Sequence, residues 1–309
     1  MKYVIYRLHF SGPVHFGKNA LSNSDYSLCS DTVFSALCTE AVAISSDKLE
    51  EFVDEVRNAR IKLSDALPYI NDEYMIPKPY VFIERSSVGD SVERKAYKNL
   101  KYIPLSAFDA YLHGEFDVFS ARSIDGLGKS AMKVSASIRN EKEESMPYEV
   151  GLFSFNENCG LYIVFGFEDD RSELLVDELM EQLSLSGVGG KRSSGYGRFS
   201  YIKDAAEDSF ADRMNSLNGK AMLLNTALPT EEELKSVIEG ASYSLTKRSG
   251  FVASVNYSDE WQRKKDIVMF KAGSCFNKPF NGDIYDVATN AGSHPVYRCG
   301  KPLFLRIDV

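Results

Sequence analysis

Residues 187–199 read Gly187-Val-Gly-Gly-Lys-Arg-Ser-Ser-Gly-Tyr-Gly-Arg-Phe199, with five glycines, three basic side chains and two serines in thirteen positions. Glycine permits positive φ angles and lets another backbone come close. Successive backbone N–H groups in such a turn can form a concave anion-binding site, and basic side chains add charge that binds phosphate. The segment therefore predicts a loop that holds a phosphate-rich ligand. The alternative is a plain glycine-rich turn between a helix and an edge strand.

Known nucleotide-binding loops do not fit this segment. A P-loop has the pattern G-x-x-x-x-G-K-[ST]. Counted from Gly190 and Lys191, its first position is Leu185 and its last is Arg192, so both ends fail. The Gly-Lys-Ser at 128–130 has Ser123 in place of the first glycine. A dinucleotide G-x-G-x-x-G pattern fails as well, because Arg192 takes the place of the third glycine.

The elements around the loop follow the order of a ferredoxin-like unit. Residues 2–10 alternate as a strand does, and two helices with apolar residues at helical spacing follow. Strand-like residues 148–155 and 161–167 are separated by a hairpin signal, and a helix leads into the loop. Strand, helix, strand pair, helix, strand is the βαββαβ order. The expected helix caps are Ser30 or Asp31, Ser46 and Ser172.

The rest of the chain predicts an insertion, a linker and a second unit. Residues 64–120 are rich in proline and poor in strand patterns, so an irregular insertion is expected over about 64–145. Polar, acidic residues 204–218 indicate a linker. Residues 219–309 begin again with strand, helix and strand pair, and the helix opens with a capping box from Thr230 to Glu233. The predicted fold is therefore α+β: two ferredoxin-like (RRM-like) units, in residues 1–203 and 219–309, the second a degenerate copy without an evident second helix.

Composition excludes several classes of protein. The chain has 309 residues, 44% of them apolar and 26% charged, as soluble globular proteins do. It has no apolar run of about 18 residues and no export signal, so neither a membrane nor secretion is expected. Five scattered cysteines include no C-x-x-C pair, so no metal or other cofactor is predicted. Free thiols fit a reducing cytoplasm.

Charge is distributed unevenly along the chain. The net charge of −8 argues against indiscriminate nucleic-acid binding. Residues 187–203 nevertheless contain four basic and no acidic side chains, whereas residues 141–181 contain twelve acidic and two basic ones. This pattern favours one confined RNA or anion site, with acidic surface left for protein partners. An ordinary solvated face is the alternative for the acidic runs.

Two such units with a basic glycine-rich loop resemble the RAMP superfamily of CRISPR-associated RNA-binding proteins. Three segments narrow the resemblance to the fourth subunit of type III-A (Csm) effector complexes. These segments are Ser11-Gly-Pro-Val-His-Phe-Gly17, Ser30-Asp-Thr-Val-Phe-Ser-Ala-Leu37 and Gly292-Ser-His-Pro-Val-Tyr-Arg-Cys-Gly300.

The resemblance implies a non-catalytic role in antiviral defence. The family's fourth subunit holds the repeat-derived 5′ handle of the CRISPR RNA and contacts the large polymerase/cyclase-like subunit and the first backbone subunit. The alternative is a metal-independent endoribonuclease of the same superfamily that processes CRISPR repeat RNA, because a loop histidine can cleave RNA in such proteins.

The glycine-rich loop supplies most of the candidate RNA-binding residues. Its glycines would hold the handle with their backbone; they are Gly187, Gly189, Gly190, Gly195 and Gly197. Lys191, Arg192 and Arg198 would contact phosphates, and Ser193 and Ser194 could donate to phosphate or 2′-hydroxyl oxygens. Tyr196 would either stack on a base or pack on the sheet.

Other candidates lie outside the loop. His15, Gly17 and Lys18 follow the first strand; His15 would contact the handle, hydrogen-bond its own turn or act in catalysis. Arg122, Lys129 and Lys133 lie in a segment that resembles the family's thumb-like hairpin over the guide RNA, with a solvated loop as the alternative. Two further segments each allow two interpretations. His294, Tyr297 and Arg298 could face a groove or merely turn the chain, and Trp261 could be a protein contact or a half-buried anchor.

Overall fold

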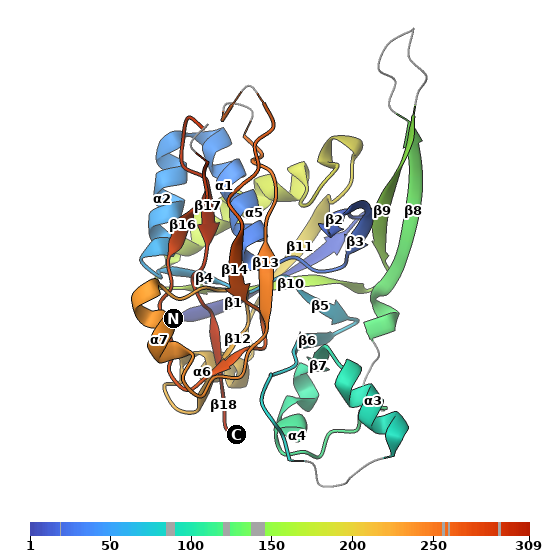
Figure 1. Cartoon of the computed structure of the whole chain (residues 1–309), viewed down its shortest axis with the longest axis vertical. Helices are drawn as coiled ribbons and strands as arrows, with labels where there is room; N and C mark the ends of the chain where they lie inside the picture. Colours follow the sequence, from blue (N-terminus) through green and yellow to red (C-terminus); the bar gives the residue numbers. More distant parts are fainter. Residues whose placement is uncertain are drawn as a thin grey trace.

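Both halves of the chain pack against one main sheet (Figure 1). The computed structural model describes residues 1–18, 20–84, 90–119, 124–136, 146–254, 257–258, 260–289 and 292–309; of Lys18 it describes the backbone only. The strand order is β11-β1-β10-β5-β6-β7, with β4 also paired to β10. The bounds are β1 Lys2–Phe10, β4 Ile61–Leu63, β5 Leu67–Ile70, β6 Glu73–Pro77, β7 Tyr102–Pro104, β10 Cys159–Phe167 and β11 Phe199–Ala205.

This sheet is buried on both faces. All nine residues of β10 are buried, as expected for a nearly continuous apolar run. Along β1, alternate side chains face opposite sides: Tyr6 joins one core and Ile5 the other. The first core lies under α1 (Ser30–Ile44), α2 (Ser46–Arg57) and α5 (Asp170–Ser186). The second lies against the C-terminal half and the insertion.

The helix caps differ from the predicted ones by one to three residues. Cys29 precedes α1, and its side chain makes no cap bond; instead Asp65 Oδ1 accepts from Ser30 N at 2.7 Å. Ser45 caps α2 and Asp169 caps α5, each accepting a backbone N–H three residues on. The predictions of Ser30 or Asp31, Ser46 and Ser172 were therefore wrong, because several adjacent polar residues can serve as caps and one cap comes from a distant residue.

Residues 64–120 are not strand-poor. They contain β5, β6 and β7. Helix α3 (Ser91–Asn99) lies between β6 and β7, and helix α4 (Phe108–Leu112) follows β7. Pro77 and Pro104 end their strands, where a missing N–H costs little, and Pro68 lies in the short β5 opposite Leu161. Two of the prolines that suggested irregular structure, Pro77 and Pro104, therefore mark strand ends.

The predicted hairpin between residues 148–155 and 161–167 is also wrong. Strand β9 (Pro147–Phe155) pairs along its length with β8 (Gly128–Ala136), whereas β10 pairs with β1, β4 and β5. A turn does follow Asn156, but the two strands diverge after it. The β8–β9 pair forms a ribbon that extends away from the body, beside β2 (Phe16–Lys18) and β3 (Ala20–Asp25) (Figure 1).

The C-terminal half packs beneath and in front of the main sheet. Its capping box is confirmed: Thr230 and Glu233 exchange bonds at the start of α7 (Glu231–Val237). The predicted linker contains α6 (Asp208–Asn215), whose Phe210 and Met214 are buried in the second core. The described strands of this half form three sheets. The first has the order β15-β12-β18 (Cys275–Phe276, Lys220–Leu223, Phe304–Ile307). The other two are the pairs β13-β14 (Leu245–Arg248, Ile267–Phe270) and β16-β17 (Ile284–Asp286, Tyr297–Cys299).

Candidate nucleic-acid interface

The glycine-rich loop is docked against the turn that follows β1. Gly190 N donates to His15 O at 2.8 Å, and Gly197 N donates to Pro13 O at 3.3 Å. Val188 is buried beneath the loop and donates to Gly197 O at 2.9 Å. Gly197 has φ of +79°, and a Cβ there would lie 2.0 Å from Val188 O. The sequence needs glycine at this position for both conformation and space, so the loop is a folded element with fixed geometry.

His15 lies inside this structure. Its side chain is 5% exposed, and Nδ1 lies 2.6 Å from the carbonyl oxygen of Gly151 on β9. The ring also limits space beside Gly190, where a Cβ would come within 2.6 Å of His15 Cδ2. His15 thus joins β9 to the glycine-rich loop. Of the three roles considered, the structure favours the structural one over direct RNA contact or catalysis.

The loop's polar side chains are presented in different ways. Lys191 lies over the Tyr148 ring, 4.8 Å from its centroid, and Arg192 pairs with Glu40 at 3.4 Å. Ser193, Ser194 and Arg198 are exposed. The loop therefore offers exposed donors at its tip, with two cations held at its flanks by neighbours.

The ribbon and the loop meet at Lys133 and Tyr196. Lys133 Nζ lies 3.1 Å from Tyr196 Oη and 5.7 Å from the centre of its ring. Lys129 is exposed four residues earlier on β8, hence on the same face of that strand. The sequence pointed to Tyr196 through the glycine-rich loop and to Lys129 and Lys133 through a separate segment. The structure places Lys133 and Tyr196 in contact. Gly17 is exposed nearby; Arg122 and the Lys18 side chain lie outside the described residues.

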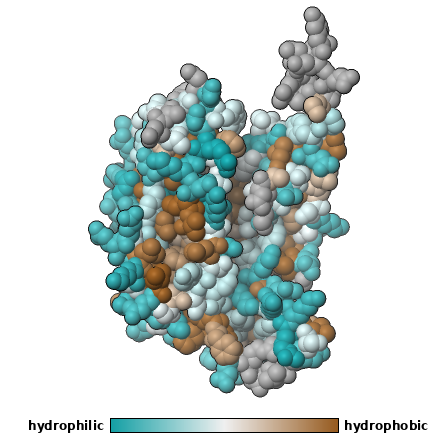
Figure 2. Space-filling view, in the orientation of Figure 1, coloured by the Kyte–Doolittle hydropathy of each residue, from teal (hydrophilic) through white to brown (hydrophobic). Residues whose placement is uncertain are grey.

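A groove of about 1360 Å³ runs from the glycine-rich loop between the two halves of the chain. Its walls come from the start of α1, from residues 77–81 and 98–102 of the insertion, and from residues 246–251 of the C-terminal half. In Figure 2 the surface is hollowed between the main body and the arm formed by the insertion. The loop is thus one end of a much larger concave surface.

The groove is basic although the chain is acidic overall. Three acidic residues line it: Asp25, Asp31 and Asp65. Nine basic residues line it: Lys78, Lys98, Lys101, Arg192, Lys247, Arg248, Lys264, Lys271 and Arg298. Sequence reasoning missed most of the lysines, because they come from segments far apart in the chain. The one signal for Lys98 and Lys101 is that residues 85–142 contain ten basic and seven acidic side chains.

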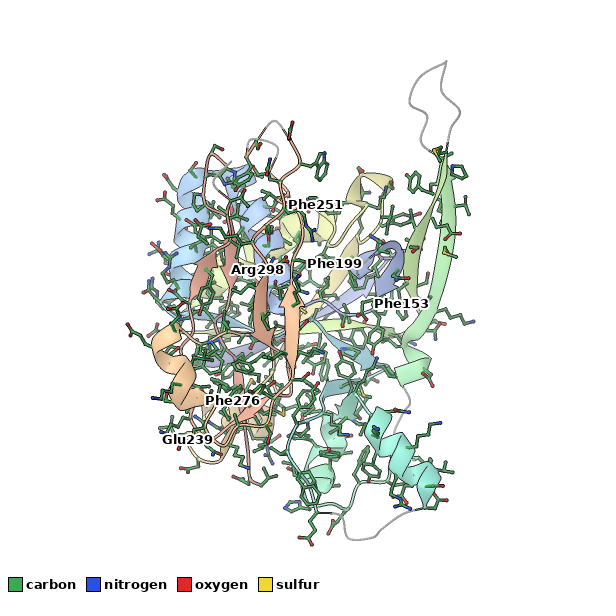
Figure 3. The ribbon with its side chains drawn as sticks, viewed as in Figure 1. Phe153, Phe199, Glu239, Phe251, Phe276 and Arg298 are labelled. Carbon is green, nitrogen blue, oxygen red and sulfur yellow. The ribbon has the colours of Figure 1, made fainter. Side chains whose placement is uncertain are left out.

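Arg248 and Arg298 meet at the groove floor on the carboxylate of Asp31. Arg248 bonds it through Nε and Nη2, and Arg298 also donates to it. Arg298, labelled in Figure 3, is 5% exposed, and its buried Nε has no hydrogen-bond partner among the residues that the structure describes. Burial, followed by the nearby Arg298 charge, lowers the pKa of Lys264. A polyanion bound nearby would stabilise crowded, partly desolvated cations of this kind.

The residues near Arg298 differ in placement. Tyr297 lines the groove and packs on the first core. His294 is exposed and bonds Ser254 Oγ at 2.9 Å. No group of three or more His, Cys, Asp or Glu side chains in the described ranges is placed to hold a metal. No helix among those ranges is long and apolar enough to span a membrane.

Comparisons with known proteins agree on one family. A family model described as the CRISPR Csm4 C-terminal domain matches residues 217–307. The CRISPR system Cms protein Csm4 of Mycobacterium tuberculosis (strain CDC 1551) is 37% identical over 295 residues, covering 95% of this chain and 94% of the relative. The protein of that name from Streptococcus thermophilus is 33% identical over 318 residues, covering 100% of both.

Solved structures have the same fold. The crystal structure of the Csm3–Csm4 subcomplex in the type III-A CRISPR–Cas interference complex matches with a TM-score of 0.68 and 19% identity, covering 100% of each chain. A Csm1–Csm4 cassette in complex with cA4 matches with a TM-score of 0.62 and 19% identity, covering 100% of this chain and 99% of the other.

Proposed function

The chain belongs to the Csm4 family of CRISPR system proteins, and we propose that it holds the 5′ handle of the guide RNA in a type III-A interference complex. One observation carries the proposal: a groove lined by nine basic and three acidic side chains in a chain of net charge −8. Concentrating positive charge in one groove favours a polyanion there and leaves the rest of the surface unfavourable for one.

The groove suits single-stranded RNA. Cations from separate segments of the chain line it, as expected of a surface that binds a flexible phosphate backbone. At one end the exposed tip of the glycine-rich loop offers Ser193, Ser194 and Arg198. Hydroxyl donors of this kind contact phosphate and 2′-hydroxyl oxygens. Outside the groove lining, Lys133 and Tyr196 meet where the loop contacts the ribbon, and Lys129 lies on the same face of β8.

We also propose that the chain links the large subunit to the first backbone subunit. Structures of the relatives named above contain Csm4 with Csm3 and Csm4 with Csm1. Exposed apolar side chains on α5 and β11, away from the groove lining, support protein contacts here: Leu174, Leu185 and Ile202. Protein interfaces use such residues in their cores. A cytoplasmic location follows from this role.

The proposed function is non-catalytic. The endoribonuclease alternative needs His15 to reach an RNA 2′-hydroxyl, since a general base must lie within hydrogen-bond reach of its proton. His15 is instead buried, with Nδ1 on the carbonyl oxygen of Gly151. This placement favours a binding protein over a nuclease.

A two-unit ferredoxin-like architecture fits the proposed function. In the first unit, residues 1–203, the order β11-β1-β10-β5 with α1 and α5 on one face supports a βαββαβ plan. The second unit, residues 219–309, has the sheet β15-β12-β18 and α7. The family match beginning at residue 217 supports a boundary near the end of α6.

The experiment is a gentle purification of the tagged protein from its native host, with sequencing of the 5′ ends of the RNA that accompanies it. The proposal predicts one short repeat-derived 5′ sequence joined to varied spacers, with a large subunit and backbone subunits in the same fraction. RNA with unrelated 5′ ends, or no RNA, would contradict it.

A further inference from the structure

We propose that Phe251 and Trp261 form a platform on which one base of single-stranded RNA stacks at the rim of the groove. This inference rests on the proposed function, because the base belongs to the RNA that the groove would hold. Hereafter these two side chains are called the aromatic pair.

The aromatic pair is held in place by the backbone yet left uncovered. Residues 250–252 and 262–264 run antiparallel, with Val252 N bonded to Gln262 O and Lys264 N bonded to Gly250 O, each at 2.9 Å. The two rings meet edge to face, with centroids 6.1 Å apart. Phe251 is nevertheless 55% exposed and Trp261 84% exposed. Because the ring planes are 86° apart, a base can lie flat on only one of them; Trp261, the more exposed ring, supplies that face, and Phe251 packs against it.

The position of the aromatic pair connects it to the groove. Phe251 itself lines the groove, in the wall that also carries Lys247, Arg248 and Lys264. Figure 3 shows Phe251 nearer the upper edge of the molecule than Arg298, which lies within the body. A base unstacked from its neighbours could therefore reach the pair while its phosphates stay along the basic wall.

Side chains of both signs flank the pair, Glu260 and Asp266 against Arg263, Lys264 and Lys265, and of these cations Lys264 lines the groove. The Arg263 guanidinium lies 5.8 Å from the centre of the Phe251 ring, and Lys264 and Lys265 follow it. Protein interfaces are depleted of lysine at their cores, because burying it against a protein is costly. RNA neutralises such cations with phosphate, while its bases stack on aromatic rings and on arginine. The aromatic pair and its cations together match that chemistry.

Trp261 is the only tryptophan in the chain, so its fluorescence reports on the pair alone. The purified full chain is titrated with a handle-sequence RNA of about ten nucleotides, within the usual site size for single-strand binding. We expect the RNA to quench Trp261 fluorescence until the protein is saturated. The quenching should occur over the same concentrations at which binding raises the fluorescence anisotropy of a labelled copy of the RNA. Trp261→Ala should weaken binding about tenfold, the effect of losing one stacked base.

Two further measurements separate stacking from other contributions. Trp261→Ala removes no charge, so the salt dependence of binding should keep the parent's slope. Trp261→Phe should restore most of the affinity, whereas the control Leu217→Ala, an exposed apolar residue between α6 and β12 outside the groove lining, should change nothing. Replacing single nucleotides with abasic ones should identify one position at which loss of the base abolishes the quenching of Trp261 fluorescence. Loss of that base should not weaken RNA binding by the Trp261→Ala variant any further.

The outcomes distinguish this inference from the proposed function. If the parent binds RNA but its tryptophan emission is unchanged and Trp261→Ala binds equally well, the platform is wrong and the groove proposal stands. If Trp261→Ala keeps RNA affinity but loses a protein subunit on purification, the pair is a protein contact and the inference is overturned. If the parent binds no RNA, both proposals fall.

Discussion

Asp31 and Arg248 join the two halves of the chain: Arg248 Nε lies 3.1 and 3.0 Å from the two carboxylate oxygens of Asp31, 217 positions away in sequence. Arg298 donates to the same carboxylate. Asp31 lies in the first turn of α1, where the helix dipole favours a negative charge. One carboxylate thus fixes the C-terminal half against the helix that forms the groove floor.

Asp31→Asn should lower the free energy of unfolding by about 3–5 kcal/mol, because it leaves buried guanidinium charge without its partner. Urea denaturation of the purified chain measures this. The control is Asp54→Asn, whose pair with Arg57 is exposed on α2 and should contribute less than about 1 kcal/mol. Equal effects of the two substitutions would show that the Asp31 cluster does not join the halves.

Asp65 should make stability depend on pH. Burial raises its pKa to about 6, although bonds from Ser30 N and Thr226 N lower it. A carboxyl with a raised pKa stabilises the fold while protonated, and this contribution is lost as pH rises from about 4 through 6, by about 3 kcal/mol. The parent's unfolding free energy minus that of Asp65→Asn should therefore fall over that range. A difference independent of pH would contradict the assignment.

Lys191→Ala combined with Arg192→Ala should weaken binding of any RNA about tenfold and reduce the slope of log affinity against log salt by about 1.4, that is about 0.7 per charge for a single strand. Fluorescence anisotropy over a salt series measures both. Lys48→Ala with Arg171→Ala removes the same charge from α2 and α5, outside the groove lining, and is the matched control. If both double variants behave alike, the glycine-rich loop does not contact RNA.

Gly197→Ala should disrupt the loop, because the new Cβ would lie 2.0 Å from Val188 O, a backbone atom that cannot move aside freely. Gly195→Ala has a similar positive φ, +84°, but nothing within 4 Å of the new Cβ. It should cost only the strain of a left-handed residue, about 1–2 kcal/mol. Gly197→Ala should lose RNA affinity and Gly195→Ala should retain it. If both variants retain it, RNA binding does not require the loop to be docked against the turn after β1.

Local patterns in the sequence predicted local structure well. Strand β1, the helix–loop–strand around residues 187–199 and the capping box at Thr230 are confirmed, because each depends on neighbouring residues. Strand pairing was predicted wrongly where two strands are adjacent in sequence but not in space: β9 pairs with β8 rather than β10. Alternation of apolar and polar residues identifies a strand but does not show which other strand it pairs with.

The candidate site was predicted only in part for the same reason. The loop residues stand together in the sequence, so their composition could be read directly. The groove lysines, such as Lys78 and Lys271, come together only through the fold. For His15 the sequence left handle contact, a structural role and catalysis open, and the fold buries its ring with Nδ1 on the carbonyl oxygen of Gly151, a contact that the sequence could not show.

The most direct test of the central claim is ultraviolet cross-linking of the assembled complex around its guide RNA, followed by mass spectrometry of peptide–nucleotide adducts. If this chain holds the handle, nucleotides of the 5′ handle should attach to peptides that contain groove-lining residues, among them residues 187–190, 192 and 246–251. Handle nucleotides attached only to other subunits, with this chain linked to none of them, would contradict it.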